Sequence, residues 1–399
     1  MKTYIIFFIG LFLLAACSED PIGQYPVDDT PPSPINKESV QVSNFPGGST
    51  ISYELPDETD LLYVKTKFTL PNGEVQDIRA SSFTNYITVK GFAKKQQYTL
   101  QLIAVDRSQN ESEPVEVTIE PEDAIIFDIV RSINYEVARG GFKMTWENAI
   151  QDEVTVTILK KNETGNFELV DAIYSSEKNA KRAVRGQDAV MTTFGVFAKD
   201  TYNNYSDTLE FSLEPLFEMQ LDNKNFVAMP KLASFVLHGW SNSSMSVMWD
   251  DVLVAGSSSG QVYYIQASDI NAYFTIDLGV TAQLSRFRMW GRNDYYFRLH
   301  NPRDFYIMGS NSLAVAQNAA SADSEWIHLL DCESYRPSGL DSSQEATEED
   351  YSYAAAGEEF EFPEDAPAVR YIRFRVRETW GGSNGLHVAE LRFWGEPVN

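Results

Sequence analysis

Short runs of apolar residues, separated by turn-forming residues, recur from about residue 40 to the end of the chain. In the first third, these runs occupy residues 50–53, 61–68, 98–105 and 115–119. Apolar residues at every second position place one face of a β-strand in a core. Short strands separated by turns such as Pro71-Asn72-Gly73 predict a β-sandwich.

The pattern of this first sandwich occurs twice. The segment around Asp106 reappears around Asp200, 94 positions further along the chain. A period of that length is close to the size of one fibronectin type III domain. We therefore predict an all-β chain that begins with two tandem Ig- or fibronectin-III-like sandwiches, at residues 38–121 and 122–216.

The N-terminus carries a cationic residue, Lys2, followed by an apolar run over residues 4–14 and then by Ala15-Ala16-Cys17. This order indicates a secretory signal, and the run is too short to span a bilayer as a mature helix. Residues 14–17 resemble the lipobox of bacterial lipoproteins. The resemblance implies a signal peptide at 1–17 and lipidation of Cys17. In the alternative, the segment is an ordinary secretory signal in which Cys17 is incidental.

Residues 18–20, Ser-Glu-Asp, are similar to the short acidic signal that directs such lipoproteins to the outer face of the outer membrane in Bacteroidetes-type bacteria. That resemblance implies a lipid-anchored protein exposed at the cell surface. Residues 18–37 are rich in proline and acidic side chains. We expect this linker to stay extended and to hold the folded part away from the membrane.

The overall charge narrows the range of partners. The chain has 57 acidic and 32 basic residues and a formal net charge of −25. Nucleic acid and anionic lipid surfaces would be repelled, so we expect neither as a ligand.

Few residues are available for cross-links, metal ions or catalysis. With Cys17 lipidated, Cys332 has no partner in the chain, so no disulfide is expected. The four histidines lack the spacing of a zinc site. There is no H-E-x-x-H motif and no phosphate-binding loop, so we expect a protein that is not an enzyme and requires no cofactor.

The last part of the chain, residues 217–399, contains further strand patterns at 273–279, 284–292, 302–310, 369–376 and 388–395. Their order is similar to that of the coagulation-factor type C, or discoidin, domain, with its I-D-L-G strand and its final A-E-L strand. The resemblance implies a discoidin-like, galactose-binding-like β jelly roll.

The first sandwich resembles the N-terminal domain of a group of surface lipoproteins from polysaccharide-utilisation loci. The residues that carry this likeness are 51–56, 60–64, 91–92 and 98–110. In that group, a second sandwich and a discoidin-like domain follow in the same order.

One strand of the last domain has a regular alternation of apolar and basic residues. Ile372 and its alternate neighbours face the core, while Arg373, Arg375 and Arg377 lie on the opposite face. This pattern favours a solvated face with salt bridges. An arginine ladder for an anionic ligand is the alternative.

A sugar site needs an aromatic platform beside hydrogen-bonding side chains. In discoidin-like glycan binders the site lies in loops at one end of the barrel. The residues here in comparable places are Arg292, Asn293, Tyr295, Tyr296, Trp380 and Asn384. Trp380 is the best platform because two glycines follow it, although it could instead anchor its own loop. His238, Trp240, Tyr263 and Tyr264 are second-rank candidates, for which packing is the preferred interpretation.

Relatives of the discoidin fold often hold a structural calcium ion, for which Asp250, Asp251 and Glu390 stand at matching places. Carboxylates suit a hard cation, but paired surface acids are also common. The acidic insertion at 342–364 is expected to be a solvated loop.

Together these features predict an outer-membrane surface lipoprotein that binds a polysaccharide or oligosaccharide non-catalytically through its C-terminal domain. An outer-membrane glycan transporter complex is a candidate partner. The alternative is an adhesive or scaffold lipoprotein that binds protein partners. Exposure of Trp380, Tyr295 and Tyr296 beside Arg292 would favour the sugar.

Overall fold

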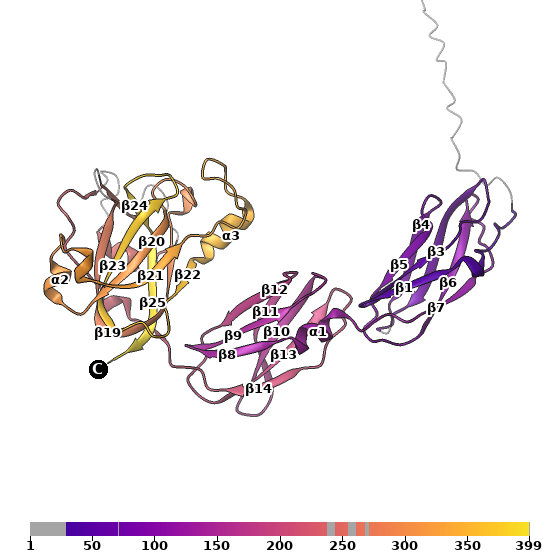
Figure 1. The fold of residues 1–399 in the computed structure, drawn as a ribbon, viewed down its shortest axis with the longest axis horizontal. Helices are drawn as coiled ribbons and strands as arrows, with labels where there is room; N and C mark the ends of the chain where they lie inside the picture. Colours follow the sequence, from indigo (N-terminus) through magenta and orange to yellow (C-terminus); the bar gives the residue numbers. More distant parts are fainter. Residues whose placement is uncertain (1–28, 71, 238–243, 254–260, 268–270, 399) are drawn as a thin grey trace, which may run out of the picture. The chain divides into compact units, whose positions relative to one another are not determined.

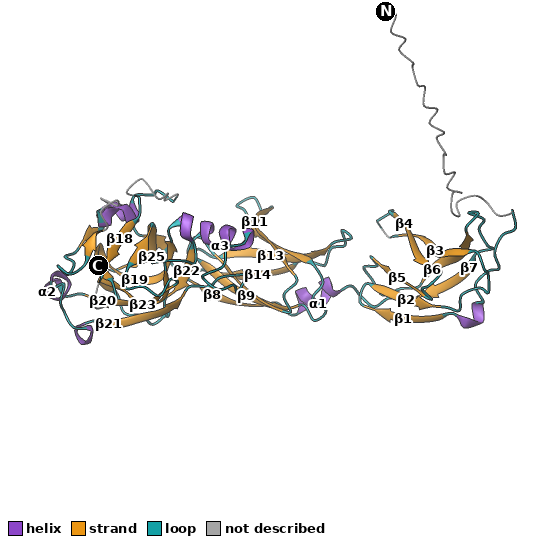
Figure 2. Cartoon of the chain, turned by 90° about the horizontal axis from the view of Figure 1, so that it is seen from above, coloured by secondary structure: helices purple, strands orange, loops and turns teal. Residues whose placement is uncertain are grey.

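The computed structural model describes residues 29–70, 72–237, 244–253, 261–267 and 271–398. The predicted signal peptide, Cys17 and most of the predicted linker lie outside these residues, as do His238 and Trp240. No helix in the described part of the chain is long and apolar enough to cross a membrane. Strands dominate throughout, as Figures 1 and 2 show, so the all-β prediction is confirmed.

The first sandwich consists of a three-stranded and a four-stranded antiparallel sheet. Its interior is filled by buried aliphatic and aromatic side chains such as Ile51, Val64 and Phe92. The smaller sheet has the order β1 (Gln41–Phe45), β2 (Gly48–Ser52), β5 (Tyr86–Lys90), and the larger has the order β4 (Val75–Ser81), β3 (Leu61–Thr69), β6 (Tyr98–Asp106), β7 (Val115–Ile119).

The second sandwich repeats this arrangement after a short helix, α1 (Ile125–Arg131). Its sheets have the orders β12 (Asn179–Val184), β9 (Gly141–Glu147), β8 (Asn134–Ala138) and β11 (Phe167–Ser175), β10 (Val154–Lys161), β13 (Thr192–Asp200), β14 (Leu209–Leu213). The two tandem sandwiches expected from the internal repeat are therefore present.

The repeated residues build the same turn in both copies. Asp106 accepts hydrogen bonds from the backbone N–H and the side-chain amide of Asn110, at 2.8 and 2.9 Å. Asp200 accepts the equivalent pair from Asn204, at 2.9 and 2.8 Å. Asp and Asn favour such turns because their short side chains bond the backbone locally. The repeat in the sequence thus records a structural requirement.

The C-terminal domain is a larger β-sandwich. Its main sheet has the order β15 (Met219–Gln220), β25 (Glu390–Pro397), β19 (Tyr273–Trp290), β23 (Val369–Thr379), β20 (Pro302–Ser310), β21 (Ile327–Glu333), and both β16 (Val227–Ala228) and β22 (Glu358–Glu361) pair with β19. A second sheet has the order β17 (Val236–Leu237), β18 (Tyr263–Gln266), β24 (Leu386–Val388). Two short helices complete the domain, α2 (Leu313–Gln317) and α3 (Glu348–Ala356).

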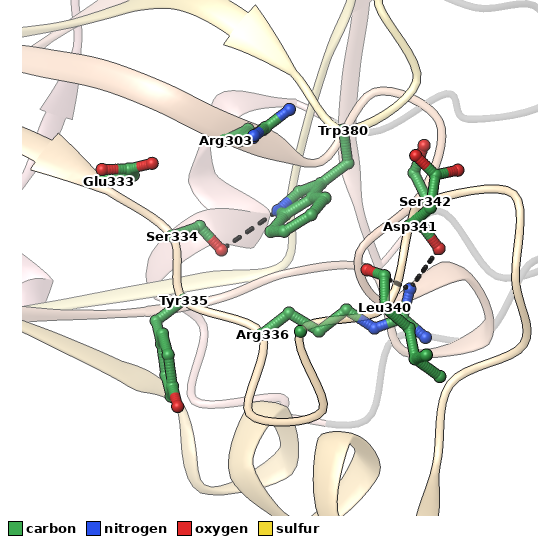
Figure 3. Close-up of a pocket in the computed structure, with 10 residues that line it drawn as sticks. Arg303, Glu333, Ser334, Tyr335, Arg336, Leu340, Asp341, Ser342 and Trp380 are labelled. Carbon is green, nitrogen blue, oxygen red and sulfur yellow. Dashed lines mark hydrogen bonds between the residues drawn. The ribbon is translucent and has the colours of Figure 1, made fainter.

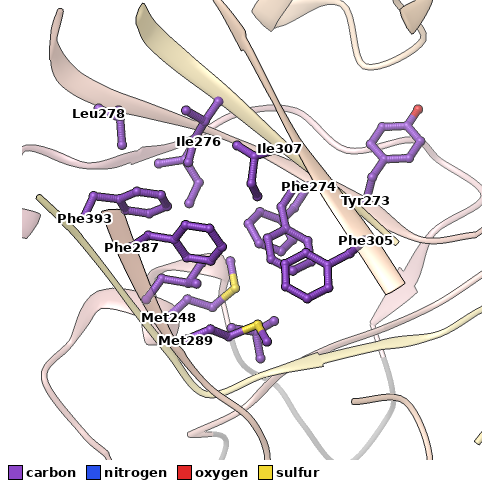
Figure 4. Packing of buried hydrophobic residues seen from close by; sticks show 14 of the residues in the cluster. Met248, Tyr273, Phe274, Ile276, Leu278, Phe287, Met289, Phe305, Ile307 and Phe393 are labelled. Carbon is purple, nitrogen blue, oxygen red and sulfur yellow. The ribbon is translucent and has the colours of Figure 1, made fainter. Parts of the chain in front are cut away.

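The core of this domain is rich in phenylalanine (Figure 4). Phe374 on β23 stacks between Phe274 and Phe305, with ring centroids 5.0 and 4.5 Å away. Offset stacking adds to the free energy of burying the rings. The apolar alternation of β23 therefore faces the core, as the sequence predicted.

The opposite face of β23 differs from the prediction. Arg373 is fully buried rather than solvated. Its guanidinium donates to the Ser321 carbonyl at 2.9 Å and lies between the rings of Tyr273 and Trp326. The segment that follows α2 covers this part of the strand, so protein oxygens take the place of water. Arg375 does form the expected surface ion pair, with Asp323 at 2.6 Å.

Candidate functional site

The C-terminal domain contains a pocket of about 530 Å³ (Figure 3). Its walls come from β20, from the end of β21 and the loop that follows it, and from the residue directly after β23. The side chains that give it its chemistry are Arg303, Glu333, Tyr335, Arg336, Asp341 and Trp380.

Trp380 is partly buried and is held from several sides. Its indole N–H donates to Ser334 Oγ at 3.1 Å, which Figure 3 shows as a dashed line. The ring packs edge to face on Phe297, with centroids 5.3 Å apart, and the Arg303 guanidinium carbon lies 5.2 Å from its centroid. Trp380 thus anchors its loop and also lines the pocket, which combines the two interpretations of the sequence.

The glycine after Trp380 permits a close approach of two backbones. A Cβ at Gly381 would lie 2.6 Å from the backbone of Leu299. The Gly381 N–H donates to the Leu299 carbonyl at 2.7 Å. A larger residue at this position would displace the loop that presents Trp380.

The pocket loop is organised by Arg336, which is almost completely buried. Its Nη1 and Nη2 atoms donate to the carbonyls of Asp341 and Glu345, each at 2.7 Å. Its Nε donates to Asp350 Oδ2 at 2.9 Å. One buried guanidinium therefore fixes the path of the loop from residue 336 to residue 345.

The acidic insertion at 342–364 is not a solvated loop. Thr347 caps the start of α3 by accepting from the Asp350 N–H at 3.2 Å, and β22 continues the main sheet. Asp350 is completely buried because it meets Arg336. Composition indicated solvation, but a buried ion pair folds the segment.

Two carboxyl groups beneath the pocket have shifted pKa values in opposite directions. Burial alone would raise the pKa of Asp350, but hydrogen bonds from Ser338, Thr347 and Arg336 hold it well below its usual range. Burial raises the pKa of Glu358 to about 7, although Ser334 and the backbone N–H of Tyr335 both donate to it.

Ser334 connects Glu358 to Trp380. The Ser334 hydroxyl donates to Glu358 Oε1 at 2.8 Å and accepts from the Trp380 indole. A titratable group near neutral pH therefore lies one hydroxyl away from the aromatic wall of the pocket.

Most of the other predicted sugar-site residues lie away from this pocket. Arg292 is buried, forms an ion pair with Asp294 at 2.6 Å and lies 4.4 Å from the Tyr295 ring centroid. Tyr296 is buried edge to face against Tyr351. These contacts give Arg292 and Tyr296 packing roles, contrary to the expectation that they face solvent.

The remaining predicted residues are more accessible. Asn293 and Tyr295 are partly buried, and Asn384 is exposed, with its carbonyl accepting from the Ala272 N–H at 3.1 Å. Neither these three nor Arg292 and Tyr296 line the 530 Å³ pocket. The structure therefore brings only Trp380 of the six into it.

The residues that accompany Trp380 were not predicted from the sequence. Arg303, Tyr335 and Asp341 come from β20 and from the loop after β21. The only local signal was the turn sequence Tyr-Arg-Pro-Ser-Gly at residues 335–339. That signal marks a loop but does not show that it meets Trp380.

The predicted calcium ligands are only partly consistent with a cation. Glu390 is completely buried and lacks a close hydrogen-bond partner within the described residues, but Arg392 Nε lies 3.8 Å from its Oε1. Asp251, however, pairs with Arg392 at 3.2 Å, and Asp250 accepts from the Val252 N–H at 3.0 Å. No set of three metal-ligating side chains converges in the described part of the chain. Calcium remains a prediction for which Glu390 is the fitting ligand.

A serine and a histidine also meet in this domain. Residues 381–385 have the G-x-S-x-G spacing, and Ser383 Oγ contacts His300 Nδ1, while His300 Nε2 lies 2.8 Å from the Tyr264 hydroxyl. The loop, however, connects two strands, whereas a nucleophile elbow leads from a strand into a helix. Tyr264 and His300 stack, with centroids 4.9 Å apart, and the group is consistent with packing.

The fold and the pocket define a multidomain β-sandwich protein with an aromatic-lined cavity in its last domain. A SusE-like protein, BT2857, of known structure is 30% identical to this chain, which covers all of that protein with 69% of its own length, at a TM-score of 0.41. The chain belongs to the SusE-like family.

Three family models match the chain in succession. DUF4959, a domain of unknown function, matches residues 32–121, DUF5126, also of unknown function, matches 122–224, and DUF5000, again a domain of unknown function, matches 249–395. No curated protein matches the chain in sequence.

Two more distant solved structures are similar only in part. The C-terminal domain of a chitobiase from Bacteroides fragilis is 12% identical, with 45% of this chain covering all of that one at a TM-score of 0.31. A segment of two fibronectin type III domains from chicken tenascin is 13% identical, with 44% of this chain covering 97% of that one at a TM-score of 0.22.

Proposed function

We propose that this protein binds glycans at the cell surface and does not cleave them. The observation that carries the proposal is the pocket beside Trp380. Its aromatic wall can contact the apolar face of a sugar ring, while Arg303, Tyr335 and Asp341 offer donors and acceptors for hydroxyl groups. Membership of the SusE-like family supports a surface protein that serves polysaccharide utilisation.

The proposal includes the expectations that the structure leaves open. Cys17 carries the lipid that anchors the chain to the outer membrane, and the linker at 18–37 acts as a spacer. The domain boundaries are those expected from the sequence, and the C-terminal domain at 217–399 is discoidin-like. A transporter complex in the outer membrane receives the captured glycan.

The site is revised relative to the sequence. Trp380 remains the platform, whereas Arg303 and Tyr335 replace the buried Arg292 and Tyr296 as its companions. The pocket is open and lined by polar groups as well as by the indole. We expect affinity for a single site to be on the order of micromolar to millimolar.

Calorimetry on the soluble chain from Ser18 onward, with the glycan that an array identifies, tests the site. We expect Trp380→Ala to cost about 1–3 kcal/mol of binding free energy. Trp380→Phe keeps a ring but removes the N–H that bonds Ser334, so it should retain part of the affinity. Phe83→Ala, which removes an aromatic side chain that is 97% exposed in the first sandwich, is the matched control.

The result that would overturn the pocket is a Trp380→Ala variant that remains folded and binds like the wild type. If the wild type binds no glycan on the array but captures membrane proteins, the alternative adhesive or scaffold function replaces the glycan-binding function.

A further inference from the structure

The second sandwich has an outer sheet face that is unusually apolar. On β11, β10 and β13, alternate residues such as Val156 and Val196 point into the core, and the intervening residues point outward. The outward set includes Tyr174, which is 80% exposed, and Leu169, which is 65% exposed. We call this surface the aromatic face and define it by its outward side chains, Thr155, Thr157, Leu159, Phe167, Leu169, Ala172, Tyr174, Phe197, Lys199 and Tyr205.

Strand register shows that these residues share one surface. Thr155 on β10 pairs with Tyr174 on one side and with Lys199 on the other, and Lys199 forms a bridge with Tyr205. Two residues along, Thr157 pairs with Ala172 and with Phe197. Neighbouring strands are about 4.8 Å apart, so the side chains of each row lie next to one another across the sheet.

The first sandwich provides an internal comparison, because the repeat aligns its strands with those of the second. Lys65 pairs with the residue three positions before Asp106, and Thr157 pairs with the residue three positions before Asp200. Lys65 and Thr157 therefore occupy equivalent positions. By the same register, Leu159 and Leu169 of the second copy correspond to Lys67 and Asp77 of the first. The bridge position that holds Tyr205 holds Glu111 in the first copy.

These equivalent residues of the first sandwich are charged and paired. Asp77 accepts from Arg79 at 3.2 Å and lies 3.8 Å from Lys67, and Lys65 pairs with Glu111. The fold therefore does not require apolar side chains at these positions, although the first copy has Ile103 and Val75 where the second has Phe197 and Phe167. Exposed apolar residues add little to stability, so their concentration in one copy indicates a binding role.

A pocket of about 460 Å³ beside Tyr174 adds polar chemistry to the aromatic face. Its walls include the carboxylates of Glu153 and Asp200 as well as hydroxyl, amine and amide groups, from Thr155, Ser175, Ser176, Lys199 and Asn203. An aromatic ring flanked by such groups suits a sugar, which has apolar ring faces and a rim of hydroxyls.

The centre of the face, at Thr157, Leu159, Ala172 and Phe197, carries no charged side chain. A Cβ at Gly195 would lie 2.8 Å from Phe167 Cε1, so the glycine lets the Phe167 ring lie against the sheet. The cations occupy its border, where Lys161 pairs with Glu210 at 2.7 Å and Lys199 lies over the Tyr205 ring. An acidic sugar over the centre would lose hydration without gaining a counter-charge.

We propose that the aromatic face is a second glycan-binding surface, which takes an extended, uncharged polysaccharide chain. This inference rests on the proposed function, since it assigns a second site for the same class of ligand. Two weak sites on one chain would raise the affinity for long polysaccharides above that for short oligosaccharides.

Native affinity gels cast with a glucan, a mannan, a xylan or a galactan test the proposal on the soluble chain from Ser18 onward, with calorimetry on the polysaccharide that retains it. Tyr174→Ala removes the most exposed ring of the face. A double variant, Leu159→Lys with Leu169→Asp, introduces the charge pair that the first sandwich has at the same positions. Phe83→Ala again serves as the control.

We expect Tyr174→Ala and the double variant each to weaken polysaccharide binding about tenfold, and Phe83→Ala to leave it unchanged. Short oligosaccharides should bind all four proteins alike, because they use the pocket at Trp380. Circular dichroism establishes whether the variants fold. If the double variant does not fold, Tyr174→Ala alone tests the proposal.

The two proposals fail in different ways. If Trp380→Ala abolishes retention while Tyr174→Ala migrates like the wild type, the aromatic face is not a glycan surface and the proposed function stands. If Tyr174→Ala weakens retention and Trp380→Ala does not, the aromatic face is the binding site and the pocket is not. If none of the four gels retains the wild type, both proposals are wrong for uncharged polysaccharides.

Discussion

Replacing Asp350 should show most clearly whether the pocket loop is folded around a buried ion pair or is solvated. Its carboxylate accepts from Ser338 N, Ser338 Oγ, Thr347 N and Arg336 Nε, at 3.0, 2.7, 3.0 and 2.9 Å. The substitution Asp350→Ala removes all four bonds. It also leaves the Arg336 guanidinium buried without a counter-charge.

The expected loss of stability is large because both partners are buried. Removing one partner of a buried ion pair typically costs about 3–5 kcal/mol. In a domain of this size, each kcal/mol lowers the melting temperature by about 2–4 °C. The C-terminal domain of Asp350→Ala should therefore melt roughly 6–20 °C below the wild type.

The pH dependence has a defined sign. The pKa of Asp350 lies below its usual range, so its contribution is complete above about pH 4, the usual pKa of an aspartate. The contribution disappears as the pH falls through the lowered pKa. The difference between variant and wild type should thus be constant from pH 5 to pH 8.

Differential scanning calorimetry and hydrogen exchange of the segment 334–358 measure these effects. Glu349→Ala is the matched control, because it removes an equal charge from an exposed neighbour. If the loop opens locally, the melting temperature falls less, but exchange protection in the segment is lost. An Asp350→Ala variant that matches Glu349→Ala in both measurements would refute the reasoning.

Three further predictions concern buried groups of the same domain. Because the pKa of Glu358 is raised to about 7, its stabilising contribution is complete below about pH 4.5 and is lost as the pH rises through 7. The loss amounts to about 1.4 kcal/mol for each unit by which the pKa is raised. The melting temperature of Glu358→Gln should therefore fall less than that of the wild type between pH 5 and pH 8. Arg373→Lys keeps the charge but loses the planar fork, so it should lower the melting temperature by several degrees, whereas Arg375→Lys at the partly exposed pair should change it little. Burial raises the pKa of Cys332, so an aromatic disulfide reagent should label it only after unfolding, and fast labelling of the native protein would contradict its burial.

The fold could be predicted because its signals are local. Strand alternation sets which side chains are buried, and the Asp and Asn residues that close the repeated turn lie only four positions apart. The same alternation places Phe374 on the core face, although it does not identify Phe274 and Phe305 as its partners. Interactions of this range are visible in a sequence without knowledge of the tertiary structure.

The candidate site could be predicted only in part, because long-range contacts build it. Glycines after Trp380 revealed the aromatic wall of the pocket. The pairing of Arg336 with Asp350 could not be predicted, because the segment that contains Asp350 has an acidic composition that indicates exposure to solvent. Arg292 was misplaced because Asp294, two residues later, neutralises it and lets it become buried.

The duplicated sandwich shows why the residues that fold the chain can be separated from those that we propose bind glycan. Both copies have the turn made by Asp106 or Asp200 and the same sheet order, so these features belong to the fold. The outer sheet face differs between the two copies, because paired charges and exposed rings are both compatible with the fold. The loops around Trp380 do not have this freedom, since Trp380 packs against Phe297 and the buried ion pair of Arg336 with Asp350 holds the loop beside it. The sheet face can therefore change at little cost in stability, and a difference between two copies of one fold is informative about function.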